Sequence, residues 1–325
     1  MLDVIANYVE NFHGEKTKID GHDGYIQDNT VYFVLPKLHD EVIHYEQKTV
    51  SDFLIDQGLD NVVTPLLNFQ GQITTQVNHT EYIVCSSNLK RDNRNILVDG
   101  QLMAILHKSG AEYPYEPQYL SSYGKWKDLW QNKIDSYEGI YLNKIKERPV
   151  TKYQRLFIDT FPYIIGLSEN ALQYLQETES ERRYHEGDQG TIVFQRYANQ
   201  LHKPYIWSHE LTYDHPVRDI AEYLRPRLLD SDSRVDELNT FFTEYEKVRP
   251  LSIFGWRLLY ARLLFPVHLF DLMEKGLSST DTNEEMYRKY KQILEEQQNY
   301  EKNVRHLFSN IGIDANKLEI PELDW

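Results

Sequence analysis

The segment that decides the fold reads Trp207-Ser208-His209-Glu210-Leu211-Thr212-Tyr213-Asp214-His215-Pro216-Val217-Arg218-Asp219-Ile220-Ala221. Its second half has the composition of a helix start, with Asp214 two residues before Pro216. An aspartate at the N-cap accepts hydrogen bonds from free backbone N–H groups, and a proline just inside the helix needs no acceptor. We therefore expect Asp214 and Pro216 to begin a helix that carries Asp219.

The whole chain is acidic and long enough to bury a large core. It has 325 residues, with 50 Asp and Glu against 35 Lys and Arg, which gives a formal charge of −15. Phosphate contacts need Lys and Arg, so this balance argues against duplex nucleic acid or an anionic membrane as a partner. The length allows two domains or one bilobal unit.

The start of the chain and its cysteine content indicate the compartment. No basic and apolar leader opens the sequence, and no apolar run reaches the length that spans a membrane. Cys85 is the single cysteine, which excludes an intrachain disulfide and fits a reducing compartment. We expect a soluble protein that is made in the cytoplasm without a signal peptide.

Tyrosine dominates the aromatic residues, with 24 Tyr against 13 Phe and 5 Trp. The favoured explanation is that tyrosine fills half-buried positions, where its hydroxyl stays polar at the surface. Many exposed phenols would instead suit a protein destined for oxidative cross-linking. Composition alone leaves both explanations open.

The first part of the chain is rich in strand patterns. Residues 24–35 form two β-rich runs around Asp28-Asn29, which is typical of a hairpin. Residues 44–57 have apolar positions at nearly helical spacing. Three more short strands are expected at residues 62–67, 72–77 and 81–85. This order predicts a small antiparallel β lobe over residues 1–86.

From residue 87 onward the pattern is helical. Apolar residues recur every three or four positions in several long stretches, as in packed helices. We expect helices at residues 95–107, 126–146, 151–178, 236–245, 255–275 and 283–308, the third of them interrupted near Pro162. Residues 87–325 are thus predicted to form a mostly helical large lobe.

The helix-start segment resembles a segment of known kinases. Asp214-x-Pro216-x-x-Asp219-Ile220-Ala221 is similar to the residues that follow the metal-binding aspartate in aminoglycoside phosphotransferases and choline kinases. The stretch Leu106-His107-Lys108 is similar to the end of the first large-lobe helix in aminoglycoside phosphotransferases. The resemblance implies a protein-kinase-like α+β bilobal fold. It also implies that Asp214, Pro216 and Asp219 are structural, with Asp219 bracing the catalytic loop.

The same resemblance places Ser208 where these enzymes have the aspartate that holds Mg²⁺ against the ATP phosphates. A neutral hydroxyl is a poor substitute, because Mg²⁺ prefers anionic oxygens and the transferred phosphoryl group needs its charge neutralised. Glu210 and Asp214 are the nearby acidic residues that a metal could recruit. The chain therefore looks like a kinase fold whose metal chemistry has been removed.

Other groups that a phosphotransferase needs are also missing. There is no Gly-x-Gly-x-x-Gly, and Gly21-His22-Asp23-Gly24 is predicted to be a turn. The strand Val31–Leu35 has no internal lysine, and Lys37 follows it too late to point inward. Glu46 could be the helix glutamate of a cofactor-binding ion pair, although a lone helix glutamate is more often a solvated charge.

Two registers are open for the catalytic loop. By residue type, Ile192-Val193-Phe194-Gln195-Arg196-Tyr197 puts Phe194 at the catalytic histidine and Arg196 at the catalytic aspartate. An arginine stays protonated and cannot act as a base. This register, which we prefer, requires a short hairpin between Tyr197 and Tyr205. We also expect it to pair Arg196 with Glu210 or Asp214.

The second register follows the spacing to Ser208. It makes Asp188, within His185-Glu186-Gly187-Asp188-Gln189-Gly190, the catalytic base. No asparagine follows Asp188 at the offset that the catalytic loop requires. A surface loop is the favoured interpretation of this stretch.

A further block narrows the resemblance. Tyr245-Glu246-Lys247-Val248-Arg249-Pro250-Leu251-Ser252, followed by Trp256 to Pro266, is similar to a block in the CotS family of Bacillus spore coat proteins. The family has the aminoglycoside phosphotransferase fold, and the closing Pro321-Glu322-Leu323-Asp324-Trp325 supports the resemblance. Its members usually retain His-x-Asp and Asp-Leu-Asp at the active site, and this sequence departs from both.

The resemblance implies a spore coat or coat-associated pseudokinase scaffold that binds other coat proteins during coat assembly. No cofactor is expected, and neither nucleic acid nor a membrane span is part of this prediction. Two alternatives stay open. One is an active small-molecule kinase with Asp188 as base and Glu210 or Asp214 at the metal. The other is a sugar- or nucleotide-binding module that holds a ligand without reacting it.

Overall fold

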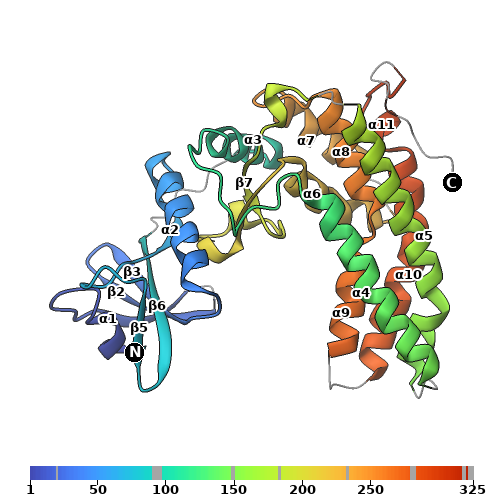
Figure 1. Ribbon diagram of the computed structural model, residues 1–325. Coiled ribbons are helices and arrows are strands. Elements are labelled where there is room, and N and C mark those ends of the chain that lie inside the picture. The colour runs from blue at the N-terminus through green and yellow to red at the C-terminus, as the bar shows by residue number, and fades with distance from the viewer. Residues whose placement is uncertain are drawn as a thin grey trace. The chain divides into compact units, whose positions relative to one another are not determined.

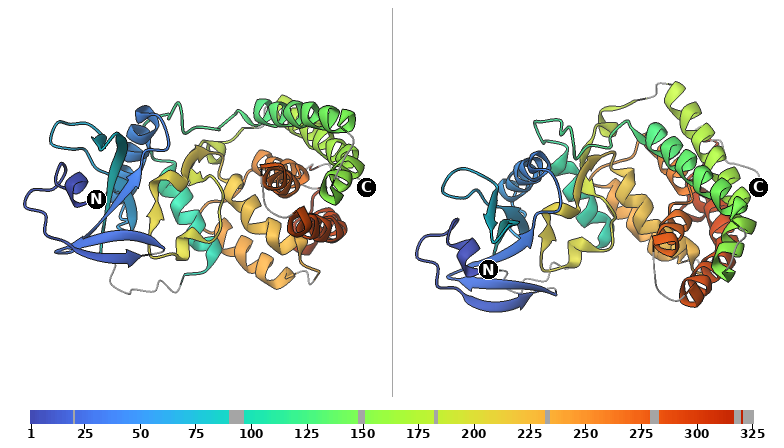
Figure 2. Two further views of the ribbon diagram at one scale, coloured as in Figure 1. Left: turned by 90° about the horizontal axis from the view of Figure 1, so that it is seen from below. Right: turned by 60° about the horizontal axis from the view of Figure 1, so that its bottom comes forward.

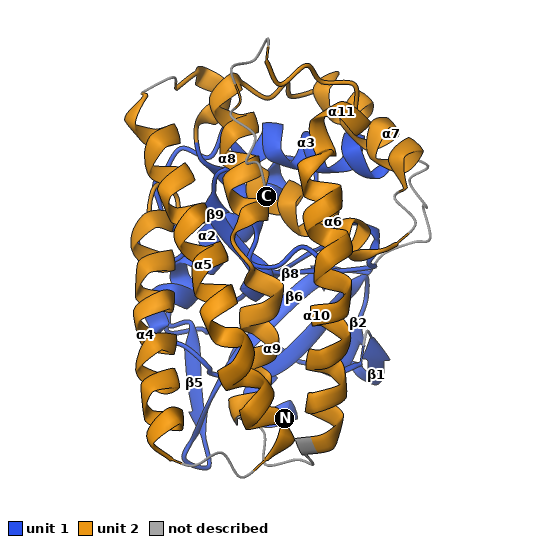
Figure 3. Cartoon of the chain, turned by 90° about the vertical axis from the view of Figure 1, so that its right-hand side faces the viewer, with its two compact units in different colours: residues 1–122, 190–216 blue, residues 123–189, 217–325 orange. Residues whose placement is uncertain are grey.

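The computed structural model describes residues 1–19, 21–89, 97–147, 151–181, 184–231, 234–278, 283–316 and 320. The closing motif at residues 321–325 lies outside them. The chain forms two compact units, coloured separately in Figure 3. Unit 1 comprises Met1–Ser122 and Gly190–Pro216, and unit 2 comprises Tyr123–Gln189 and Val217–Trp325. The predicted boundary after residue 86 follows the lobes of a kinase, whereas the compact units divide after Ser122 and return a later segment to unit 1.

Unit 1 is built on a seven-stranded sheet (Figure 1). The strands are β1 (Glu15–Ile19), β2 (His22–Gln27), β3 (Thr30–Pro36), β4 (Val62–Pro65), β5 (Thr74–Val77), β6 (Thr80–Asn88) and β8 (Ile206–Trp207). Their order is β1-β2-β3-β6-β4-β8, and β5 pairs with β6. Among these strands, as far as the structure describes them, β4 and β8 pair in parallel and the other pairs are antiparallel. The hairpin predicted over residues 24–35 is confirmed, and its turn contains Asp28 with a φ of +56°.

Side chains alternate between the two faces of this sheet, and each face has its own core. One face carries a set of residues that we name the Trp207 cluster: Val31, Phe33, Val63, Ile83, Cys85, Tyr205 and Trp207. The opposite face packs Val34 and Val84 against the short helix α1 (Leu2–Ile5). Helix α2 (Glu41–Asp56) packs on β4. We did not predict α1 or β1, because elements this short show no hydrophobic period.

Helix α3 (Asp99–Gly110) and a small sheet of β7 (Thr191–Phe194) with β9 (Leu211–Asp214) complete unit 1. The start predicted for this helix at residue 95 lies outside the described residues, and the helix ends at Gly110. A Cβ at Gly110 would lie 2.7 Å from the backbone nitrogen of Ile192. Glycine therefore allows α3 to end directly against β7.

Unit 2 is helical. Its elements are α4 (Trp126–Lys146), α5 (Lys152–Ser180), the 3-10 turn η1 (Glu186–Asp188), α6 (Val217–Leu229), α7 (Val235–Glu246), α8 (Ile253–Leu264), α9 (Val267–Ser278), α10 (Asn283–Arg305) and α11 (Leu307–Asn310). Helices α4 and α5, in green, lie side by side in both views of Figure 2. The bounds predicted for α4 are confirmed. None of the described helices contains a stretch long and apolar enough to cross a membrane.

Two prolines in unit 2 have opposite effects. Pro162 lies inside α5, which continues through it, so the predicted interruption is wrong. A capping box of Thr151 and Gln154 fixes the start of α5, and its buried apolar face offsets the hydrogen bond that proline cannot donate. Pro266 instead separates α8 from α9, so the single helix predicted at residues 255–275 is also wrong.

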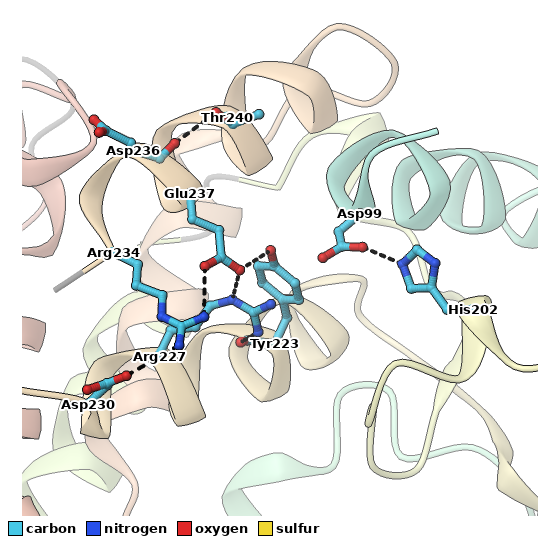
Figure 4. A network of polar contacts seen from close by, with 9 residues as sticks. All are labelled: Asp99, His202, Tyr223, Arg227, Asp230, Arg234, Asp236, Glu237 and Thr240. Carbon is cyan, nitrogen blue, oxygen red and sulfur yellow. Dashed lines mark hydrogen bonds and ion pairs between the residues drawn. The ribbon is translucent and has the colours of Figure 1, made fainter. Parts of the chain in front are cut away.

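Charged side chains join α6 to α7 within unit 2 (Figure 4). Arg227 Nε donates to Glu237 Oε1 at 2.6 Å, and Arg234 lies 3.4 Å from Glu237 and 3.6 Å from Asp230. Burial works to raise the pKa of Glu237, but hydrogen bonds and charges from the two arginines outweigh it and lower that pKa below its ordinary value. The network therefore favours the folded state at neutral pH.

Candidate functional site

The residues singled out from the sequence fall in both units. Unit 1 contains Glu46, Arg196, Ser208, Glu210 and Asp214, and unit 2 contains Asp188 and Asp219. The metal position and the preferred catalytic-loop register thus belong to one compact unit, and the alternative base belongs to the other.

Ser208, at the expected metal position, begins a single 3-10 turn, η3 (Ser208–Glu210). It is buried, and its carbonyl accepts from the N–H of Leu211. The turn forms because β8 pairs with β4 whereas β9 pairs with β7, so the chain changes sheets at this point. A serine fixed at this bend offers a metal ion no negative charge.

Glu210, the carboxylate nearest to Ser208 in sequence, has one engaged oxygen. Its Oε1 lies 3.8 Å from Lys203 Nζ and accepts from Gln200 Nε2 at 3.4 Å. Its Oε2 is buried without a hydrogen-bond partner among the described residues. We expected Arg196 to pair with Glu210 or Asp214, but Glu210 contacts Lys203 instead. Its Oε2 makes no hydrogen bond within the described residues.

Arg196 follows β7 and is exposed. Its carbonyl accepts from Gln200 Nε2 at 2.8 Å, and the chain then forms the 3-10 turn η2 (Gln200–His202). A hydrogen bond between His202 and Asp99, the first residue of α3, holds this turn (Figure 4). The predicted hairpin between residues 197 and 205 is therefore wrong, because side-chain contacts close this stretch without strand pairing.

Asp214 is fully buried at the end of β9. Its two carboxylate oxygens accept from Ser122 Oγ and from His215 N, each at 2.7 Å. Helix α6 begins at Val217, so Pro216 lies directly before the helix and the N-cap predicted at Asp214 is wrong. The pairing of Asp214 with Thr191 keeps it in the strand. A metal at Asp214 would have to share its two oxygens with these donors.

The segments that would bind phosphates in a kinase, the β1–β2 connection and the third strand, lack the phosphate-binding residues here. Ile19 pairs with His22, so only residues 20 and 21 connect β1 to β2, and Gly21 has a φ of +83°. The predicted turn is confirmed at Gly21, whereas Gly24 lies inside β2, where an added Cβ would be 3.1 Å from the Phe33 ring. Lys37 follows β3 and pairs with Glu81 at 2.9 Å.

Glu46 on α2 accepts three hydrogen bonds from one distant segment. The donors are the backbone N–H groups of Gln118, Tyr119 and Leu120, at 2.7, 2.9 and 2.8 Å. Kinases use a helix glutamate to hold the phosphate-binding lysine of a strand. Glu46 is therefore not the free solvated charge that we favoured, and a lysine that paired with it would share its oxygens with these three N–H groups.

Aromatic rings fill the sheet face that leads to Ser208. The centre of the Trp207 ring lies 4.8 Å from that of Phe33 on β3 and 4.4 Å from that of His22 on β2. In kinases the equivalent third strand supplies the phosphate-binding lysine. A cavity of about 500 Å³ lies on the opposite face, lined by residues that include Tyr32 and Ser86. The face beside the metal position is thus packed with side chains.

Asp188 is an anchor of unit 2. It is 2 % exposed, and its carboxylate accepts from Ser252 Oγ at 2.6 and 2.8 Å and from His185 N at 2.7 Å. Ser252 also caps α8 by accepting from Gly255 N at 2.8 Å. The stretch predicted to be a surface loop is exposed at His185, Glu186 and Gln189, but Asp188 itself is buried, because this contact holds η1 against the start of α8. The serine of the Pro250-Leu251-Ser252 motif thereby gains a structural explanation.

Asp219 is fully buried in the first turn of α6. A carboxylate is favourable there, because the first N–H groups of a helix carry partial positive charge. Burial raises the pKa of Tyr245, and the negative charge of Asp219 adds to that rise. The structural importance of Asp219 stays a prediction.

Three residues at these sites were missed in the sequence: Ser122, Trp207 and Ser252. Ser122 and Ser252 act on aspartates far away in the chain, which no local pattern reveals. Trp207 had a signal, since it is a large aromatic residue directly before the metal position. Within the described ranges, no group of three or more His, Cys, Asp or Glu side chains could hold a metal ion.

Solved structures share this fold. An aminoglycoside phosphotransferase from Alicyclobacillus acidocaldarius superposes with a TM-score of 0.63 at 12% identity, covering 95% of this chain and 96% of that one. A microcompartment-associated aminopropanol kinase gives 0.55 at 13% identity, covering 94% and 96%. Similarity at this identity shows the fold alone, and it confirms the predicted protein-kinase-like α+β class.

Relatives at higher identity show the family. The family described as "Spore coat putative kinase YutH" matches residues 5–307. The endospore coat-associated protein YutH of Bacillus subtilis (strain 168) is 32% identical over 286 residues, covering 85% of this chain and 83% of that protein. The chain therefore belongs to the YutH family of kinase-like spore coat proteins.

Proposed function

We propose that this protein has the fold of a phosphotransferase without its activity and acts in the spore coat by binding other coat proteins. Its relative in Bacillus subtilis is endospore coat-associated. The observation that carries the proposal is the engagement of Glu46 by three backbone N–H groups. These three N–H groups occupy most of the acceptor sites that a phosphate-binding lysine would need.

The surroundings of Ser208 support the same proposal. Phosphoryl transfer needs positioned positive charge at the phosphates and anionic ligands for the metal. Ser208 brings no charge, and the oxygens of Asp214 accept from Ser122 and His215. The Trp207 cluster covers the neighbouring sheet face. The proposal therefore includes no nucleotide or metal cofactor.

A thermal-shift experiment with Mg-ATP tests the proposal. A ligand that binds only the folded state at roughly 100 times its Kd adds about 2.7 kcal/mol. For a chain of this length each kcal/mol raises Tm by roughly 2 °C or somewhat less, so a competent nucleotide site would shift Tm by several degrees. We expect no magnesium-dependent shift and no ATP hydrolysis above a blank, with an active aminoglycoside phosphotransferase as the positive control. A clear magnesium-dependent shift would contradict the proposal.

Restoring one catalytic group gives a second test. Ser208→Asp should restore neither the shift nor hydrolysis, because the lysine, the base and the glycine loop are still absent and such groups act as a unit. Activity in this variant would show that Ser208 alone separates the protein from a working kinase.

One observation favours an active small-molecule kinase instead. Oε2 of Glu210, two residues after Ser208, is buried without a hydrogen-bond partner in the described part of the chain. If this oxygen binds Mg²⁺, Glu210→Gln abolishes the magnesium-dependent shift, and the exposed control Glu138→Gln leaves it intact. A nucleotide shift that needs no magnesium and brings no turnover would instead indicate a binding module.

A further inference from the structure

The segment between α3 and α4 carries an aromatic motif that the proposed function does not use. It reads Tyr113-Pro114-Tyr115-Glu116-Pro117-Gln118-Tyr119. Tyr115 and Tyr119 are 68% and 65% exposed, more than any other tyrosine that the structure describes, whereas Tyr113 is buried. Two exposed tyrosine rings four residues apart in the sequence are a candidate contact surface.

The backbone under these rings is held in place. Glu46 accepts from the N–H of Gln118, Tyr119 and Leu120, so both ends of the residue that carries one ring are fixed. Tyr113 Oη donates to Thr49 Oγ1 at 3.1 Å, next to the other exposed ring. A partner that binds here finds an ordered surface and loses little conformational entropy on binding.

Charge defines what this surface can bind. Residues 109–124 contain Glu112 and Glu116, both exposed, and no Lys, Arg or His. Tyrosine faces attract cations, and carboxylates form their strongest hydrogen bonds with guanidinium groups. Arginine meets both requirements better than lysine, because its planar guanidinium group stacks on aromatic rings and donates two parallel hydrogen bonds to a carboxylate.

We propose that Tyr115, Tyr119, Glu112 and Glu116 form a docking surface for an arginine-rich segment of a partner protein. This surface is named the tyrosine platform. The formal charge of −15 favours approach of such a segment by long-range attraction. The inference deepens the scaffold proposal and rests on it only for the partner being a coat protein.

Synthetic peptides test the tyrosine platform. The probe is a short fluorescein-labelled peptide in which Arg alternates with Gly, compared with peptides that have Lys or Glu in place of Arg. Measured by anisotropy, the Arg peptide should bind most tightly and the Glu peptide should not bind. Tyr115→Ala with Tyr119→Ala should weaken the Arg peptide by roughly tenfold.

The control is Tyr184→Ala, which removes a tyrosine of unit 2 that is 58% exposed. Its affinity for the Arg peptide should equal that of the unmodified protein. Equal binding by the Tyr115/Tyr119 variant, equal weakening in the control, or no binding of the Arg peptide would each overturn the platform.

Variants of Glu46 test whether peptide binding needs the ordered backbone under the tyrosine platform as well as its exposed side chains. Glu46→Ala leaves both exposed rings in place but removes the acceptor of three N–H groups, so hydrogen exchange at residues 118–120 should become faster. Binding of the Arg peptide should weaken by roughly tenfold, with Glu46→Gln between the two because it keeps one acceptor oxygen. Faster exchange with unchanged affinity would overturn the role of Glu46.

The same samples distinguish this inference from the scaffold proposal. Loss of peptide binding without any Mg-ATP shift overturns the platform and leaves the scaffold standing. A Mg-ATP shift together with normal peptide binding overturns the scaffold and leaves the platform standing.

Discussion

The Trp207 cluster of unit 1 and the contact of Asp188 with Ser252 in unit 2 show two ways in which a fold can lose the chemistry of its relatives. In unit 1, rings of Phe33, Tyr205 and Trp207 pack on the sheet face beside the metal position. In unit 2 a buried carboxylate is present, but its oxygens are engaged by Ser252 and His185. An acidic residue in such a fold therefore indicates catalysis only when its oxygens keep lone pairs free for a substrate or a metal.

The largest expected effect on the free energy of unfolding comes from the Trp207 cluster of unit 1. Trp207→Ala removes a buried ring that packs on Phe33, and it should lower the free energy of unfolding by about 3–5 kcal/mol in urea titrations. His22→Ala, which removes a less buried ring against Trp207, is the control and should cost less. A loss below about 1 kcal/mol would show that the rings are not a packed core and that the face is open to a ligand.

The next effect concerns the unit 2 side. Asp188→Ala leaves buried donors of Ser252 and His185 without their acceptor and should cost about 3 kcal/mol. Ser252→Ala should cost less, and the double variant should show a coupling energy of about 1–3 kcal/mol, because both changes remove one shared contact. Additive effects would show that Asp188 is not held by Ser252.

Two variants compare Asp219, which we predict to be structural, with Ser208, which occupies the expected metal position. Asp219→Ala removes a fully buried carboxylate from the first turn of α6 and should cost about 1–3 kcal/mol. Ser208→Ala removes one neutral hydroxyl and should cost clearly less than Asp219→Ala. Equal destabilisation of the two variants in denaturant would contradict this assignment.

The smallest effect is a pH dependence within unit 2. Nδ1 of His268 lies 3.3 Å from Arg225 Nη1, and its Nε2 lies 2.7 Å from Gln297 Oε1. Burial, and then the charge of Arg225, lower the pKa of His268 from 6.5 to about 3. Between these values the unfolded chain binds a proton that the folded chain excludes, so stability is full above pH 6.5 and falls as the pH drops toward 3.

We expect the free energy of unfolding to fall by about 1 kcal/mol between pH 6.5 and 5.5. His268→Gln should weaken this dependence without abolishing it, because burial also lowers the pKa values of His44 and His209. Glu237→Gln is the control, because the lowered pKa of Glu237 contributes stability above 4.5 that is lost only at lower pH. A dependence of unchanged size in His268→Gln would assign it to other groups.

Local sequence patterns were enough to predict much of the fold. The bounds of α4 and the hairpin around Asp28 follow from hydrophobic period and turn composition. The site was harder, because its contacts join distant residues: Glu46 binds N–H groups 72 to 74 residues away, and Asp188 binds a serine 64 residues away. Pro162 and Pro266 differ for the same reason, since packing around each helix decides whether the chain continues through a proline.

The parallel pairing of β4 with β8 has a consequence for synthesis on the ribosome. Val63 lies level with Trp207, which is made about 140 residues later, so at 5–20 residues per second the delay is roughly 7–30 s. During this time the nascent sheet has an unpaired edge, and Phe33 and Cys85 lack the covering rings of Tyr205 and Trp207. A translation product that stops before residue 205 therefore exposes an aggregation-prone sheet, whereas one that reaches residue 216 contains all of unit 1.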